Sequence, residues 1–287
     1  MSAVTIPLPR VASPTRRWLR RYGLAALGGA IVLAWALAAL FAPWLMAHDP
    51  NFVDVANRLK PPSAEHWMGT DALGRDVLAR VVFGARISLS VGMVVVLIGG
   101  LFGTLLGAVA AYARGWAEEA LMRVTDLVFC FPPIILAMAI AAALGIGTVN
   151  TVIAMLVVWW PKFARLARSL VITQRSLEYV EAAQSVGFGP THILLRQIIP
   201  NAVGPLIVLV TLDLGQAILV FAGLSFLGLG VVPPTAEWGA MVAEGRELVQ
   251  QWWVATFPGL AILTVVMGFN FVGDGIRDWL DPHARTR

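Results

Sequence analysis

Residues 181–201 read EAAQSVGFGPTHILLRQIIPN, a polar and basic stretch between apolar runs that are long enough to cross a bilayer. The first residues favour a short helix, Gly187 suits the left-handed position that ends a helix, and Pro190 can open a second helix. The stretch predicts a helix–turn–helix hairpin at a membrane surface, presented to another protein. A surface helix without a partner would look similar in isolation.

The composition indicates a membrane protein. Of the 287 residues, 58% are hydrophobic and only 13% are charged, whereas soluble domains carry about a quarter charged residues. The single cysteine, Cys130, lies in an apolar run, so an intramolecular disulfide is excluded and a small buried side chain is expected.

Charge bias decides how many times the chain crosses the membrane. The apolar runs predict spans at about 23–46, 87–112, 127–144, 148–161, 202–222 and 253–273. With the N-terminus inside, six spans leave 15 of the 21 Lys and Arg residues in the cytoplasm, whereas five spans would leave only 8 there. Because basic residues gather on the cytoplasmic side, six spans and two cytoplasmic termini are predicted.

The predicted organisation follows from these spans. We expect a cytoplasmic tail at 1–22, a retained anchor helix at 23–46, an external segment at 47–86, a five-span core at 87–275 that includes the hairpin at 176–200, and a cytoplasmic tail at 276–287. The arginine cluster at 16–21 is expected to fix the orientation and contact anionic lipid, with no role in binding nucleic acid. The Gly- and Pro-broken stretch 223–245 predicts a re-entrant or surface-lying cap on the outer face.

Several local features carry further expectations. Residues 77–82 predict an interfacial helix leading into the second span, and residues 113–126 a short internal loop. The Gly99, Gly103 and Gly107 series predicts a ridge that another helix can approach closely. Trp159-Trp160-Pro161 is expected to close the fourth span, and Ser176 to cap the first helix of the hairpin.

Motifs for catalysis are missing from the sequence. Neither lysine follows a glycine, so there is no phosphate-binding loop, and there is no HExxH, paired-cysteine or GxSxG pattern. The four histidines, at 48, 66, 192 and 283, are scattered over different segments, so no metal site is expected. The sequence therefore predicts a chain that binds no cofactor and is not an enzyme by itself.

The hairpin resembles the EAA loop of ATP-binding cassette (ABC) importer permeases. The residues that carry the resemblance are Glu181, Ala182, Ala183, Gly187, Ile198, Pro200 and Asn201. Four other stretches resemble the second permease of the dipeptide, oligopeptide and nickel branch: 69–89 (GTDALGRDVLARVVFGARISL), 122–126 (MRVTD), 226–241 (FLGLGVVPPTAEWGAM) and 269–282 (FNFVGDGIRDWLDP).

The resemblance implies an all-α bacterial inner-membrane protein with the six-helix, MetI-like type I importer fold. It also implies a homologous partner permease, two separate ATPase subunits that bind ATP and Mg²⁺ and receive the hairpin, and an external substrate-binding protein. Peptides are the expected substrates, while glutathione and nickel chelates stay open. A secondary transporter is a remote alternative, since Asp213 alone would fit its mid-membrane charges.

Five residues are candidates for contacts along the transport path. Asp213 is the one acid inside a predicted span, so it either lines the pore against a charged substrate or bonds the partner permease or water. Gln216, one turn on, is expected on the same face, and Asn270 is a weaker pore candidate. Glu237 and Trp238 are expected to face the binding protein, although Trp238 could instead anchor in the headgroup belt.

Overall fold

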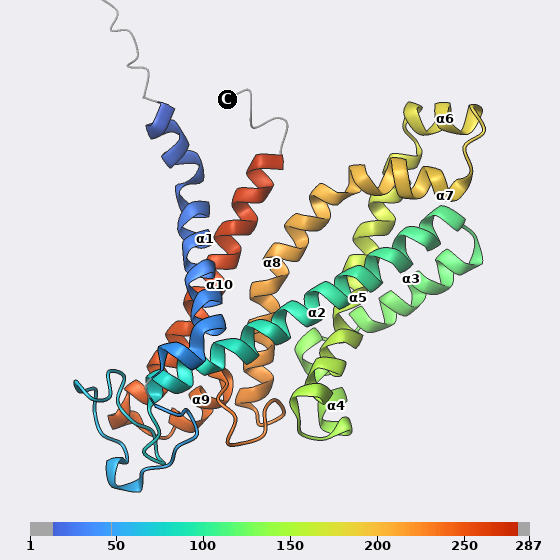
Figure 1. Cartoon of the computed structure of the whole chain (residues 1–287). Coiled ribbons are helices and arrows are strands. Elements are labelled where there is room, and N and C mark those ends of the chain that lie inside the picture. Colours follow the sequence, from blue (N-terminus) through green and yellow to red (C-terminus); the bar gives the residue numbers. More distant parts are fainter. Residues whose placement is uncertain (1–13, 47, 281–287) are drawn as a thin grey trace, which may run out of the picture.

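The computed structural model describes residues 14–46 and 48–280, in which helices account for the regular structure apart from one isolated bridge between Thr70 and Asp76. Figure 1 shows the arrangement of the helices, several of which are long rods. The α-helices are α1 (Pro14–Leu45), α2 (Val77–Ala113), α3 (Trp116–Phe129), α4 (Pro133–Leu144), α5 (Thr148–Arg175), α6 (Glu178–Ser185), α7 (Pro190–Ile193), α8 (Ile199–Phe226), α9 (Trp238–Gly245) and α10 (Trp253–Leu280).

Among the residues that the structure describes, four helical stretches are long and apolar enough to cross a membrane: Tyr22–Leu45, Val77–Ala113, Pro190–Phe226 and Trp253–Leu280. A fifth crossing is added if α3 and α4, which meet at 89°, are taken as one bent span. Lys162, Arg165 and Arg168 lower the hydropathy of α5, which is nevertheless long. Six membrane crossings therefore remain a prediction.

Several predicted boundaries are wrong. The residues expected to form an internal loop, 113–126, are mostly α3, because the charges that suggested a loop pair with α5 instead. Glu118 bonds Arg168 and Asp126 bonds Arg165, each at 2.7 Å. The predicted span 127–144 is divided between α3 and α4, since the chain turns at Pro132-Pro133 and restarts there.

The other differences arise because several helices are longer than predicted. Helix α5 does not close at Pro161 but runs on to Arg175, and the predicted interfacial helix at 77–82 is continuous with the second span as α2. Part of the predicted tail at 1–22 is helical, because α1 begins at Pro14; residues 1–13 and 281–287 lie outside the described residues. The cap region begins later than expected, since α8 extends to Phe226.

The glycine ridge of α2 packs on α5, which confirms the predicted close approach of a helix. A Cβ atom on Gly103 would overlap the carbonyl of Trp160, and one on Gly107 would overlap the carbonyl of Ala164. A Cβ atom on Gly99 would lie 3.3 Å from the Cβ atom of Trp159, which is a tight contact. Since only glycine lets the two backbones come this near, the ridge fixes how α2 lies along α5.

The two ends of the molecule are different. Figure 1 shows the start of α1, the end of α10 and the small helix α6 at one end, and α9 with the segment that joins α1 to α2 at the other. We call the second group, residues 48–76 and 227–252, the outer cap.

A buried charge cluster ties the two parts of the outer cap together. Arg75 Nε lies 2.6 Å from Asp71, and Arg80 Nε lies 3.5 Å from the same carboxylate. Both guanidinium groups also reach Glu244 of α9, at 3.0 and 3.1 Å. Asp71, Arg75 and Arg80 are at most 4% exposed, so each charge depends on its partners.

Glu237 and Trp238 are buried in the outer cap, so their predicted contact with a binding protein is wrong. Both are 0% exposed. The Glu237 carboxylate caps α9 by accepting bonds from the amides of Gly239 and Ala240 and from the Ser88 hydroxyl. Burial raises the pKa of Glu237, and the two amide bonds offset part of that rise. The Trp238 indole donates to the carbonyl of Val81 and packs edge-on against Trp35.

We expect Glu237→Ala to destabilise the protein by about 2 kcal/mol or more, because it removes the cap of α9 and leaves the Ser88 hydroxyl unpaired in a dry site. Thermal unfolding of the purified chain in detergent measures the loss. Glu247→Ala is the matched control, since Glu247 lies in the same cap but is exposed. Equal melting temperatures for the two variants would show that the cap does not stabilise the fold.

Candidate functional site

The hairpin at 176–200 stands out at the end of the molecule opposite the outer cap (Figure 1). Helix α6 is only two residues from the end of α5, and Gly187 follows it with a φ of +89°. Pro190 occupies the first turn of α7, which continues through a π-helical turn, Leu194–Ile198, into α8. The predicted helix–turn–helix is confirmed, but the second helix does not stop before Pro200.

The start of α6 differs from the prediction in one detail. Ser176 does not cap the helix: its hydroxyl donates to the carbonyl of Thr173, and Leu177 occupies the cap position without a side-chain bond. Glu178 and Glu181 lie in the first turn, where their negative charge interacts favourably with the helix dipole. The helix is therefore stabilised by charge rather than by a capping hydroxyl.

Gly187 is required by backbone conformation and not by space. A Cβ atom there would have nothing within 4 Å, so a side chain would not clash. A φ of +89° is nevertheless unfavourable for any residue with a Cβ atom. The turn between α6 and α7 depends on this glycine.

The inner face of the hairpin is anchored to two long helices, α2 and α5. Val180, Ala183, Ile193 and Ile198 are buried, at 6% exposure or less. They form one apolar cluster with residues of α2 and α5: Ala108, Ala111, Ala167 and Val171.

Polar bonds add to this anchorage. Arg175, at the end of α5, donates to the carbonyl of Tyr112 on α2 at 2.7 Å, and the Tyr179 hydroxyl bonds Gln174 at 2.6 Å. Asn201 donates to the carbonyl of Gln197 at 2.8 Å. These bonds link the hairpin to α2, α5 and α8.

The residues of the predicted coupling motif are divided between two faces. Glu181, Ala182 and Gly187 are exposed, as are Pro200 and Asn201 at the start of α8. Ala183 and Ile198 are buried in the anchoring cluster. Ala182 therefore lies on the exposed side of the helix, whereas Ala183 packs against α2 and α5.

Two apolar side chains on the outer face were missed in the sequence. Val186 is 77% exposed and Phe188 is 45% exposed, on either side of Gly187. The Phe188 ring stacks on His192 with 4.4 Å between ring centroids. The signal was present in the sequence as two large apolar residues at a turn, where polar residues are usual.

Asp213 is paired within the chain. Its carboxylate lies 2.5 Å from the Lys162 ammonium and accepts a bond from the Trp159 indole at 3.1 Å. The ammonium also lies 4.1 Å from the centre of the Trp159 ring. Neither of the predicted partners, a substrate or a second permease, is needed to satisfy the charge, and the pair joins α8 to α5.

The other path candidates do not join Asp213. Asp213 is 7% exposed, whereas Gln216 on the same helix and Asn270 on α10 are exposed. Asp213 and Gln216 are three residues apart on α8 and differ in exposure, so the shared pore face stays a prediction. Lys162, which sequence reasoning did not single out, is the more accessible member of the ion pair, with a side chain 29% exposed.

Two family models match the chain. Residues 103–286 match the binding-protein-dependent transport system inner membrane component, and residues 13–62 match the N-terminal transmembrane domain of oligopeptide transport permease C.

Curated relatives agree with these matches over most of their length. A probable D,D-dipeptide transport system permease protein of Escherichia coli K12 is 47% identical, with 88% of this chain and 86% of the relative covered. A glutathione transport system permease protein of Pectobacterium atrosepticum is 42% identical, with 98% and 96% covered. A dipeptide transport system permease protein of Alkalihalophilus pseudofirmus is 44% identical, with 93% and 88% covered.

The extent of these matches, together with the hairpin and the apolar helices, decides the family. Transport in it is driven by ATP hydrolysis on a separate subunit, so the chain is a transport component and not an enzyme. This chain belongs to the family of binding-protein-dependent inner membrane components, the permease subunits of ABC importers.

Proposed function

We propose that the chain imports short peptides as one of two permeases in an ABC importer, and that its hairpin receives the movement of an ATPase subunit. The observation that carries this proposal is the division of the hairpin into an exposed outer face and an inner face anchored to α2 and α5. An element with these two faces is able to accept a contact from outside and transmit it inward.

The outer face offers the chemistry of a docking surface. It presents the acidic Glu181 beside two exposed apolar side chains, Val186 and Phe188. A small apolar contact with one charged residue at its side is typical of protein–protein interfaces. We propose that Glu181, Ala182 and Gly187 meet the ATPase subunit, while Ala183 and Ile198 hold the hairpin in place.

The inner connections suggest how the movement reaches the transport path. Helix α5 leads into the hairpin and α8 leads out of it, and the Lys162–Asp213 pair joins these two helices again further along. The hairpin, α5 and α8 then form one element that moves as a unit. We propose that its displacement opens the path alternately to the two sides, with the second permease completing the path.

The proposed orientation has the hairpin in the cytoplasm and the outer cap outside. It is supported by the excess of basic residues in the predicted cytoplasmic segments, and it has both termini inside. Helix α5 and the bent α3–α4 pair would then supply two of six crossings, with the charges of α5 facing α3 and α8. The external binding protein would dock on exposed residues of the outer cap.

Short peptides are the proposed substrates because two of the relatives named above are permeases for dipeptides. Glutathione is a second candidate, since another relative that covers nearly the whole chain is a glutathione permease. Glutathione is itself a tripeptide, so one path could suit both. Uptake of radiolabelled dipeptides and glutathione by the reconstituted importer separates them.

We expect Glu181→Lys to weaken the contact with the ATPase subunit at least about tenfold, because it reverses the charge on the proposed docking face. Co-purification of the ATPase subunit with the tagged permease measures the effect. Glu119→Lys is the matched control, since it reverses an exposed charge on α3, outside the hairpin. Full retention of the ATPase subunit by the Glu181→Lys variant would argue against docking at this face.

We expect Asp213→Asn to lower stability by about 2–3 kcal/mol and to reduce uptake, because the largely buried Lys162 then lacks its counter-charge. The double variant Lys162→Met/Asp213→Asn removes both charges and should recover most of the stability and uptake. Thermal unfolding and peptide uptake by the reconstituted importer measure these changes. A double variant that is as stable as the wild type but does not transport would instead indicate that the pair contacts the substrate.

A further inference from the structure

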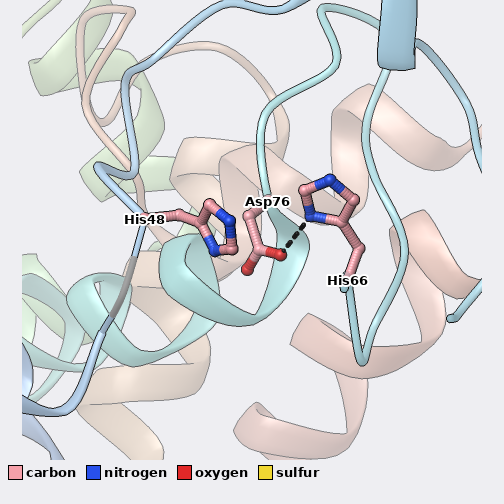
Figure 2. Close-up of side chains that lie close together, drawn as sticks. All are labelled: His48, His66 and Asp76. Atoms are coloured by element: carbon pink, nitrogen blue, oxygen red, sulfur yellow. Dashed lines mark hydrogen bonds and ion pairs between the residues drawn. The ribbon is translucent and has the colours of Figure 1, made fainter. Parts of the chain in front are cut away.

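Two histidines and an aspartate that lie apart in the sequence come together in the outer cap. His48 follows α1, His66 lies in the loop beyond it, and Asp76 is the residue before α2 (Figure 2). One nitrogen from each histidine and one oxygen from the aspartate lie within 4.8 Å of one another. The histidines are scattered in the sequence, so no metal site was expected there, but the chain folds back and brings two of them beside Asp76.

The three side chains form a set of donors with a definite preference. Imidazole nitrogens together with a carboxylate oxygen suit Zn²⁺ and neighbouring transition metals, whereas Mg²⁺ and Ca²⁺ prefer oxygen ligands alone. Sites with three such protein ligands leave a further position for water or a small molecule.

We propose that His48, His66 and Asp76 bind one divalent transition-metal ion of the zinc class at the outer cap. The proposal does not depend on the transported substrate or on docking of the hairpin. It assigns these residues a role that the transport path does not require.

Two of the three ligands are already held in position. One oxygen of Asp76 caps α2 by accepting a bond from the amide of Ala79 at 2.7 Å, and this bond orients the other oxygen toward His66. The backbone of His66 is fixed by a bond to the Ser63 hydroxyl at 3.1 Å. Supporting bonds of this kind orient ligands in metal sites.

The hydrogen bonding of His66 favours exchange of a proton for a metal ion. Its Nδ1 lies 2.8 Å from the Asp76 oxygen, while its Nε2 is buried with no hydrogen-bond partner in the described structure. The ion would bind Nδ1 in place of the proton that lies between this nitrogen and the carboxylate, and that proton would move to Nε2, so that the ring stays neutral. The exchange would break no second hydrogen bond of the ring.

His48 supplies the accessible side of the site. Its side chain is exposed, and its ring centre lies 5.1 Å from that of His66. Atoms that bind one zinc ion tetrahedrally lie about 3.3 Å apart. The ligand atoms lie within 4.8 Å of one another, so they need to approach by at most about 1.5 Å to bind one ion. A surface hollow of about 430 Å³ lined by His48, Asp49 and Phe83 gives an ion access to it.

A bound ion would fasten the exit of α1 to the start of α2. Without the ion, the contact of His48 with the other two residues is only a ring contact at an exposed position. With the ion bound, residues at the two ends of the loop between α1 and α2 would be joined through it. The ion would thus stabilise the segment that carries the buried charge cluster of the outer cap.

The test is titration of the purified full chain, with any histidine tag removed, with Zn²⁺ in a calorimeter, and with Mg²⁺ as the hard-cation comparison. His48→Ala removes the exposed ligand. Asp76→Asn removes the anionic ligand while keeping an oxygen that can cap α2. His192→Ala is the matched control, because it removes a histidine from the hairpin at the other end of the molecule.

The proposal predicts one Zn²⁺ per chain, no saturable Mg²⁺ binding, and a melting temperature raised by Zn²⁺. It also predicts affinity reduced at least about tenfold in His48→Ala and in Asp76→Asn but unchanged in His192→Ala. Absence of saturable Zn²⁺ binding by the wild type would overturn it, leaving a hydrogen-bonded His66–Asp76 pair. Equal affinity of the wild type and both ligand variants would overturn it as well.

Discussion

The contact between the backbones of α2 and α5 is the constraint on which the rest of the structure depends. Gly103 and Gly107 let α2 approach within van der Waals distance of carbonyl groups on α5. Next to these glycines, small apolar residues of α2 and α5 form the surface, or floor, against which the hairpin packs. A wider separation of α2 and α5 would open that floor, so the position of the hairpin is set by residues that lie well away from it.

The packing also explains why a short hairpin is able to act on long helices. Its inner side chains are apolar and buried, and it is joined to α5 and α8 with hardly any intervening loop. The ion pair of Lys162 with Asp213 binds the same two helices to each other. In the proposed coupling, a movement of the exposed face would therefore reach α5 and α8 without a long intervening loop.

The sequence predicts some parts of this structure well, and the reasons differ from part to part. The hairpin could be predicted because Gly187 and Pro190 have strong local preferences, and the ridge because glycines recur on one helix face. Helix α3 was taken for a loop because charge was read as exposure, whereas its acids pair with arginines of α5. Ion pairs between distant segments leave no local signal in the sequence. The pairing of Lys162 with Asp213 could not be predicted for the same reason.

The prediction for two residues of the outer cap was wrong for a related reason. Glu237 and Trp238 follow a proline pair in a segment predicted to be external, which suggested exposure. Their burial depends on Ser88 and Val81 of α2, far away in the sequence. A predicted position outside the membrane was thus equated with contact with solvent, although the cap is thick enough to bury side chains of its own.

The charge cluster of the outer cap has a consequence for biosynthesis. Arg75 and Arg80 are made early, but the carboxylate that both of them share in α9, Glu244, is about 160 residues further along the chain. Until the ribosome has delivered that residue, the two guanidinium groups have only Asp71 to neutralise them. Completion of the outer cap is therefore a late event in synthesis, and a chain that stops short of α9 leaves two guanidinium groups with one carboxylate between them.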